Sequence, residues 1–296
     1  MRLRFALMLL PFALFTSRNS AAQDSPAATE AHESVDIFER VVANQKKNDQ
    51  ALDAYERLER VEIRGTGSDG KPGEVKIFRV IPAGTGVDHI PVDALGKPLD
   101  AAAYRAELQK LAKNLAWAAE PGRAQQEAYE KVAKKRKERD DLIDATRSAF
   151  LFTFLSKEER DGRVLSKYRM DPNPAFKPTS RLTTFFTKVS GTVWIDDASG
   201  QLARIDGQVT DDITVGLFLA KVYRGSHFMQ ERYELVPGIW VPTFSQYDFD
   251  GRKFLMSINI HERTFYTDYR LIGPPKEALK AIRAELDNSS TSASGH

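Results

Sequence analysis

The chain has 296 residues, of which 43 are basic, 41 are acidic and none is cysteine. A chain without cysteine has no disulfides, thiolate metal sites, iron–sulfur clusters or cysteine nucleophiles. Residues 1–22 contain three arginines and no acid, so residues 23–296 hold 40 basic and 41 acidic residues, a net charge of −1. This balance argues against a nucleic-acid partner, which would need a basic surface.

The first 22 residues have the three zones of a secretory signal. Arg2 and Arg4 give a positive start, and an apolar run covers residues 5–15. This run is shorter than the roughly 20 residues that cross a bilayer as a stable anchor. Small residues at 20–22 offer a cleavage site before Gln23. We therefore expect export, cleavage near Ala22, and a periplasmic protein that does not span the membrane.

The segments that follow begin with a helical pattern and continue with a strand pattern. Residues 23–33 are rich in alanine, serine and acids, and we expect a flexible leader. From Ser34 to Leu58 apolar residues recur at three- and four-residue steps, which predicts an amphipathic helix. Residues 61–64 and 74–81 alternate between apolar and polar types, which predicts a first β-hairpin.

Residues 65–71, between these strands, match the letters of a dinucleotide-binding fingerprint. Such a phosphate site needs glycines that open a helix, because the amides of the first helical turn bind the anion. Here Pro72 follows the glycines and a strand pattern begins at Val75. We therefore interpret the segment as a hairpin turn and predict no cofactor.

Residues 100–148 are predicted to form a helical hairpin inserted between β segments. Asp100 is a good N-cap for the first helix, Pro121-Gly122 breaks it, and the second helix begins near Ala124. A basic run occupies residues 131–139 of the second helix. This run predicts either a solvated surface with intrahelical ion pairs or a positive face for anionic headgroups.

From residue 164 to residue 272 the pattern is that of consecutive antiparallel strands. We expect α+β architecture, with a curved antiparallel sheet (half-barrel), covering helices and the helical hairpin, in one domain over residues 34–287. A short helix over 277–286 and a disordered tail over 288–296 complete the chain. The predicted strands are 164–170, 182–189, 192–196, 202–209, 213–222, 228–235, 240–249, 254–262 and 264–271.

The candidate catalytic and metal-binding residues do not form a recognisable motif. The acidic pairs 196–197 and 211–212 lie at predicted strand ends, where aspartate commonly caps turns. Neighbouring carboxylates on a strand diverge, whereas a general acid and base must converge on one bond. We therefore predict no enzyme and no metal site. A site built from His227, His261 and Asp211 or Asp212 is the remaining metal alternative.

Aromatic residues are dense between Phe185 and Tyr269, and strand alternation divides them between two faces of the sheet. Bulky residues on a curved sheet either fill a core or line a cavity for an apolar ligand. If a cavity is present, we expect it to be lined by apolar residues of the predicted strands. The candidates are Val193, Ile195, Ile205, Met229, Tyr233, Tyr247, Phe249, Phe254, Met256, Ile258 and Ile260.

Two segments carry a resemblance to a known family. Residues 191–205 read Gly-Thr-Val-Trp-Ile-Asp-Asp-Ala-Ser-Gly-Gln-Leu-Ala-Arg-Ile, and residues 233–242 read Tyr-Glu-Leu-Val-Pro-Gly-Ile-Trp-Val-Pro. With the order of elements, they resemble the bacterial periplasmic outer-membrane lipoprotein carriers and the lipoprotein-sorting superfamily (LolA/LolB-like). The helical hairpin is longer than a minimal carrier would need.

The resemblance implies a half-barrel that shelters acyl chains between sheet and helices. We accordingly expect a non-enzymatic periplasmic protein that binds lipid or lipoprotein acyl chains, with peripheral membrane contact and envelope proteins as further partners. The alternative is a cell-envelope interaction module with a solid core, which docks partners through the helical hairpin.

Overall fold

The computed structural model describes residues 26–64, 73–180, 182–215, 220–253 and 256–293. The chain divides into two compact units. Unit 1 comprises residues 1–48, 135–240 and 246–260, and unit 2 comprises residues 49–134, 241–245 and 261–296. The predicted export signal and the glycine-containing turn at 65–71 lie outside the described residues.

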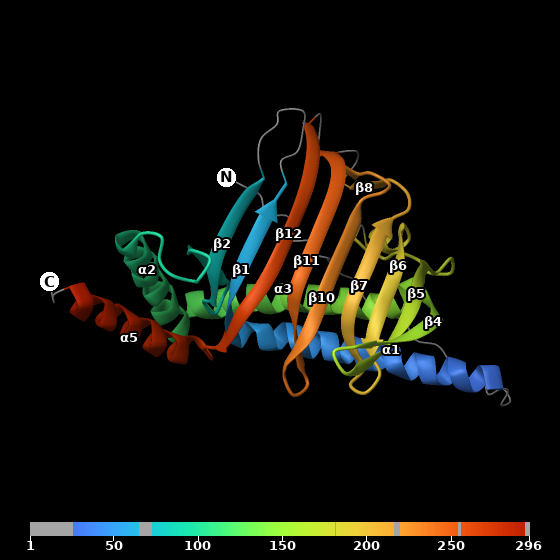
Figure 1. Cartoon of the computed structure of the whole chain (residues 1–296), viewed down its shortest axis with the longest axis horizontal. Coiled ribbons are helices and arrows are strands. Elements are labelled where there is room, and N and C mark those ends of the chain that lie inside the picture. The colour runs from blue at the N-terminus through green and yellow to red at the C-terminus, as the bar shows by residue number, and fades with distance from the viewer. Residues whose placement is uncertain (1–25, 65–72, 181, 216–219, 254–255, 294–296) are drawn as a thin grey trace. The chain divides into compact units, whose positions relative to one another are not determined.

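The elements combine an antiparallel sheet with helices, which confirms the α+β class (Figure 1). The helices are α1 (Pro26–Ala51), α2 (Ala101–Ala119), α3 (Arg123–Ala149), α4 (Thr183–Phe186) and α5 (Pro275–Ala293), with a 3-10 turn η1 (Leu52–Ala54). The strands are β1 (Tyr55–Ile63), β2 (Glu74–Pro82), β3 (Val87–Pro91), β4 (Phe150–Arg160), β5 (Arg163–Pro172), β6 (Val189–Asp196), β7 (Gln201–Val209), β8 (Ile213–Val215), β9 (Ala220–Val222), β10 (His227–Val236), β11 (Ile239–Lys253) and β12 (Met256–Leu271). Their order in the sheet is β3-β2-β1-β12-β11-β10-β7-β6-β5-β4. Two short strands lie off this path: β9 pairs with β11, and β8 pairs with β9.

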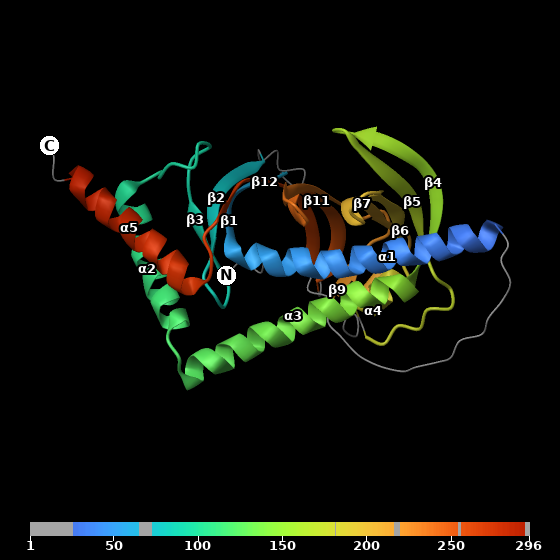
Figure 2. The same ribbon diagram turned by 90° about the horizontal axis from the view of Figure 1, so that it is seen from below.

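Unit 1 has a core between strands β4 to β7 and the helical residues of the same unit. The strands curl, and the unit 1 residues of α1 and α3, 26–48 and 135–149, run along one side of them (Figure 2). Phe38 of α1 stacks on Phe152 of β4 at 3.8 Å between ring centroids, and Leu142 of α3 is almost fully buried in the same cluster. Large apolar side chains from both helices therefore meet one face of the strands, as an amphipathic helix requires.

The C-terminal part of α1 is held to the strands of unit 1 by amide side chains. Asn48 Nδ2 donates to Gln201 Oε1 at 2.8 Å, while Asn48 Oδ1 accepts the Trp240 backbone N–H at 2.9 Å. One turn earlier, Asn44 donates to the carbonyls of Ser199 and Gly200. Asn48 is 1% exposed, so both ends of its amide need partners within the protein, and both have one.

Unit 2 has a second core, formed by β2, β3, α2 and α5. Leu108, Leu111 and Leu115 repeat along one face of α2 and pack with Ile282 of α5. The spacing of these leucines is that of a buried helical stripe. The N-cap prediction is confirmed, because Asp100 Oδ1 accepts the Ala103 N–H at 2.7 Å. The sequence did not predict α5 as the partner of α2.

Several element boundaries differ from the sequence-based prediction. The predicted strand over 182–189 is wrong, since residues 183–186 form α4. Strand β4 was missed, and β1 begins at Tyr55, in what was predicted as the end of a helix. The strand predicted to end at residue 249 continues to Lys253 as β11, and β12 is one strand where two were predicted. Helix α1 already begins at Pro26, and α5 continues to Ala293.

Candidate functional site: a groove in unit 2

Unit 2 carries an open groove with a volume of about 1760 Å³. Its walls come from the start of β1, the end of β12, the loop before α2, and the facing sides of α2 and α5. Apolar side chains dominate the walls, among them Leu58, Leu95, Leu108, Leu271 and Ile272. The volume exceeds the range of about 300–1,000 Å³ that drug-sized ligands need, so a long flexible molecule fits.

The loop between β3 and α2 forms one wall of the groove and has a defined conformation. Asp93 Oδ1 accepts the backbone N–H groups of Leu95 and Lys97, both at 2.8 Å. Gly96 has a φ of +75° and lies against Leu58, to which an added Cβ would come within 3.2 Å. The aspartate therefore satisfies the turn, while the glycine permits its close approach to β1.

A cluster of charged side chains lies at the base of the groove. Arg79 of β2 donates through Nε and Nη2 to Glu56 Oε2 of β1, at 3.0 and 2.8 Å. Through Nη1 it also donates to both carboxylate oxygens of Glu285 on α5 and to Tyr104 Oη on α2. Arg270 of β12 donates to the other oxygen of Glu56. The cluster thus joins five elements of one unit around two guanidinium groups.

Burial makes this cluster costly to disrupt. Arg79 is 8% exposed and Glu56 is 4% exposed. Burial alone would lower the pKa of Arg79, but the carboxylates of Glu56 and Glu285 outweigh it, so the pKa is raised and the guanidinium stays charged. Burial raises the pKa of Tyr104, whose hydroxyl donates to Glu285 at 2.8 Å.

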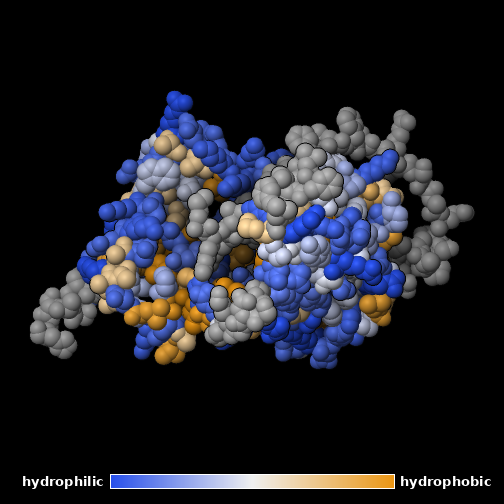
Figure 3. Space-filling model, turned by 90° about the horizontal axis from the view of Figure 1, so that it is seen from above, coloured by the Kyte–Doolittle hydropathy of each residue, from blue (hydrophilic) through white to orange (hydrophobic). Residues whose placement is uncertain are grey.

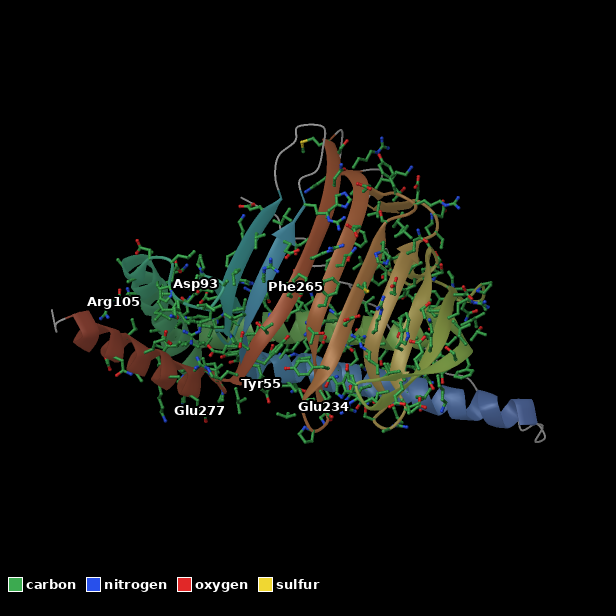
Figure 4. All side chains as sticks on the ribbon, viewed as in Figure 1. Tyr55, Asp93, Arg105, Glu234, Phe265 and Glu277 are labelled. Carbon is green, nitrogen blue, oxygen red and sulfur yellow. The ribbon has the colours of Figure 1, made fainter. Side chains whose placement is uncertain are left out.

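Apolar side chains also reach the surface of unit 2, as the left part of Figure 3 shows. Leu95 is 77% exposed and Leu271 is 65% exposed, and both line the groove. Arg105 of α2 donates to the Leu286 carbonyl of α5 at 3.0 Å, beside the same groove (Figure 4). The groove therefore offers apolar walls, a charged base and a partly polar rim.

The residues predicted from the sequence as a cavity lining all belong to unit 1, and Phe254 lies outside the described residues. None of the described ones lines the groove of unit 2. Val193 and Ile195 are buried in the core of unit 1, with Ile205 packed against it. Phe249 is 9% exposed and its ring lies tilted against that of Tyr247, whereas Tyr233 and Met256 are exposed. Met229, Ile258 and Ile260 are half-buried. A cavity among these residues stays a prediction.

Sequence reasoning missed the groove because its residues come from five separated segments. Glu56 was assigned to a helix, where it would have been a solvated acid. The available signal was Arg79, a basic residue within the apolar strand pattern of 74–81. An arginine at such a position is buried only when acidic partners are present.

The histidines and acidic pairs of the metal alternative have other partners. His227 Nε2 lies 2.7 Å from Asp206 Oδ1, and Asp211 and Asp212 pair with Lys188 and Lys221. Among the described residues, no group of three or more His, Cys, Asp or Glu side chains is arranged to hold a metal ion.

The helices carry polar surfaces over much of their length. In the basic run of α3, Lys137 pairs with Asp141 at 2.7 Å, the intrahelical ion pair that the sequence favours. Within the part of the chain that the structure describes, no helix is both long and apolar enough to cross a bilayer.

Comparison with known proteins gives similar structures but no sequence match. No protein-family model and no curated protein matches the chain. A LolA superfamily protein from Nitrosomonas europaea is similar with 9% identity and a TM-score of 0.31, over 82% of this chain and 96% of that one. An outer membrane lipoprotein-sorting protein domain from Vibrio parahaemolyticus has 11% identity and a TM-score of 0.31, over 83% and 99%. A DUF1329 family protein from Desulfovibrio piger has 11% identity and a TM-score of 0.27, over 81% and 92%. The first two of these structures are named for the superfamily that residues 191–205 and 233–242 resemble.

Proposed function

We propose that this protein is a non-enzymatic periplasmic binder of lipid or of lipoprotein acyl chains. The observation that supports this function is the groove of unit 2, which has apolar walls and enough volume for a long chain. An acyl chain gains about 0.8 kcal/mol per buried methylene, so a chain of ordinary length binds by burial without any chemistry. The charge cluster at the base of the groove holds β1, β2, β12, α2 and α5 together around the bound acyl chain.

Native mass spectrometry of the exported protein, purified without detergent, tests this function. A bound mass that dissociates on activation and matches a phospholipid or an acylated peptide supports it. Saturable binding of a fluorescent fatty acid should then be lost in A102W, because Ala102 lines the groove. The matched control is A106W. It makes the same change at Ala106, an exposed residue of the same helix, and Ala106 does not line the groove.

The apolar residues predicted from the sequence offer a second place for the chain, in unit 1. Met256 and Tyr233 are 67% and 42% exposed, so a ligand there could reach them. Lipid binding that survives A102W but is lost in M256D would place the acyl chain in unit 1. A protein that carries no lipid and shows no saturable lipid binding would contradict the proposed function and favour the envelope interaction module.

A further inference from the structure

The groove of unit 2 has a charge that differs in sign from that of the mature chain. Five basic and three acidic residues line it, a net charge of +2. Residues 23–296 together carry a net charge of −1. A concave site with apolar walls focuses the field of its charges, so the net charge of the lining acts on any ligand that enters.

The charge cluster at the base does not account for this excess. Arg79 and Arg270 are matched there by Glu56 and Glu285, so the cluster itself is neutral. Arg57 pairs with Glu59, a residue just outside the lining, at 2.7 Å. The remaining charged residues of the lining are Lys97, Arg105 and Asp268, so an excess of one positive charge lies at the rim of the groove.

Lys97 is the rim cation with the clearest access to a ligand. It is exposed, it lines the groove, and its ammonium group makes no ion pair with any residue that the structure describes. Its backbone is fixed by Asp93, whose Oδ1 accepts the Lys97 N–H at 2.8 Å. The backbone of Lys97 is thus held in place two residues after Leu95, while its exposed side chain is free to reach a ligand at the rim.

We infer that the groove selects amphiphiles with an anionic head, such as a phosphate or carboxylate, and places that head at the rim near Lys97. The inference rests on the proposed function, since it assigns the head of a ligand whose chain lies in the groove. The chain lies along the apolar walls, and the neutral cluster at the base has no unmatched charge to bind the head. Long-range attraction draws the anionic head to the rim.

Two lysophospholipids with the same acyl chain test the inference, measured by titration calorimetry below their micelle concentrations. One carries an anionic phosphoglycerol head and the other a zwitterionic phosphocholine head. We expect the anionic one to bind about five- to tenfold more tightly, and we expect added salt to reduce the difference. K97E abolishes the net charge of the lining and should reduce the preference to about twofold or less.

The matched control is K113E, which makes the same change of charge at an exposed position of α2 that does not line the groove. It should keep the preference, and both variants should unfold at the wild-type temperature. Equal affinity of the wild-type protein for both lipids, or an unchanged preference in K97E, overturns the inference and leaves the proposed function in place. No binding of either lipid contradicts the proposed function itself. Tight binding of glycerol 3-phosphate alone would assign the rim to a free phosphate instead of a lipid head.

Discussion

Arg79 Nε and Nη2 donate to a single carboxylate oxygen of Glu56, at 3.0 and 2.8 Å, in a place where both side chains are almost fully buried. The second oxygen of that carboxylate accepts from Arg270. Buried charges of this kind are tolerated only when each is matched, because removing one partner leaves the other without water or counter-charge. The pair therefore joins β1 and β2 at the base of the groove, and loss of either partner should be costly.

Replacement of Arg79 by methionine should lower the free energy of unfolding by about 3–5 kcal/mol, since Glu56 and Glu285 lose their shared cation. Urea denaturation measures the change. The control is R60M, in which an exposed pair with Glu62 is removed and a loss of at most about 1 kcal/mol is expected. Equal losses of free energy of unfolding in the two variants would show that the buried cluster contributes no more to stability than an exposed ion pair.

The pair of Asp206 and His227 should make stability depend on pH at the acid end. Burial acts to raise the pKa of Asp206, but hydrogen bonds from Arg204 and His227 outweigh it, so the pKa lies below its usual value. A carboxyl group with a lowered folded pKa stabilises the protein above its unfolded pKa of about 4 and loses this effect as the pH falls through the folded value.

D206N should therefore be less stable than the wild-type protein at pH 7, by about 1 kcal/mol. The difference should shrink as the pH falls below about 4, because the carboxyl group is then protonated first in the unfolded chain and, at lower pH, in the folded protein. Thermal unfolding between neutral and acid pH measures both variants. A constant difference across this range would contradict the assignment.

Asp100 should stabilise α2, and with it one wall of the groove. Its carboxylate accepts the Ala103 N–H at 2.7 Å at the start of the helix. D100A should cost about 1 kcal/mol, while D100S should retain most of the stability because serine is also a good N-cap. Chemical denaturation of the three proteins provides the comparison, and a serine variant as unstable as the alanine variant would argue against capping.

Ile195 and Met256 were both predicted to line an apolar cavity, and their exposure separates them. Ile195 is fully buried and Met256 is 67% exposed. I195A should lower the free energy of unfolding by about 3 kcal/mol, because it leaves a cavity in the core of unit 1. M256A should change it by less than about 0.5 kcal/mol. A small loss in I195A would mean that this core is loosely packed and open to ligands.

The fold class could be predicted from the sequence because strand alternation and turn residues are local signals. The cap at Asp100 and the break at Pro121-Gly122 are of the same kind. Strand β4 was missed because its burial pattern does not alternate: Phe154 and Leu155 are consecutive and both exposed. A register shift between Phe154 and Ser156 disturbs the alternation at this point.

The groove could not be predicted because it depends on contacts between residues far apart in the sequence. Arg79 and Glu285 are separated by 206 positions, and their pairing requires α5 to pack against α2. No periodicity within one segment carries that information. The dense aromatic residues between Phe185 and Tyr269, by contrast, are visible in the sequence. Whether such residues fill a core or leave a cavity depends on the helices that cover them.

Asn48 and Gln201 constrain how this chain can diverge. Gln201 Oε1 accepts from Asn48, while its Nε2 faces the Gly238 carbonyl at 3.4 Å, so its amide cannot turn over without losing both partners. Aspartate at position 48 would bring two acceptors together. Substitution at either position should therefore be accompanied by substitution at the other, and this covariation would identify homologous chains after most other residues have changed.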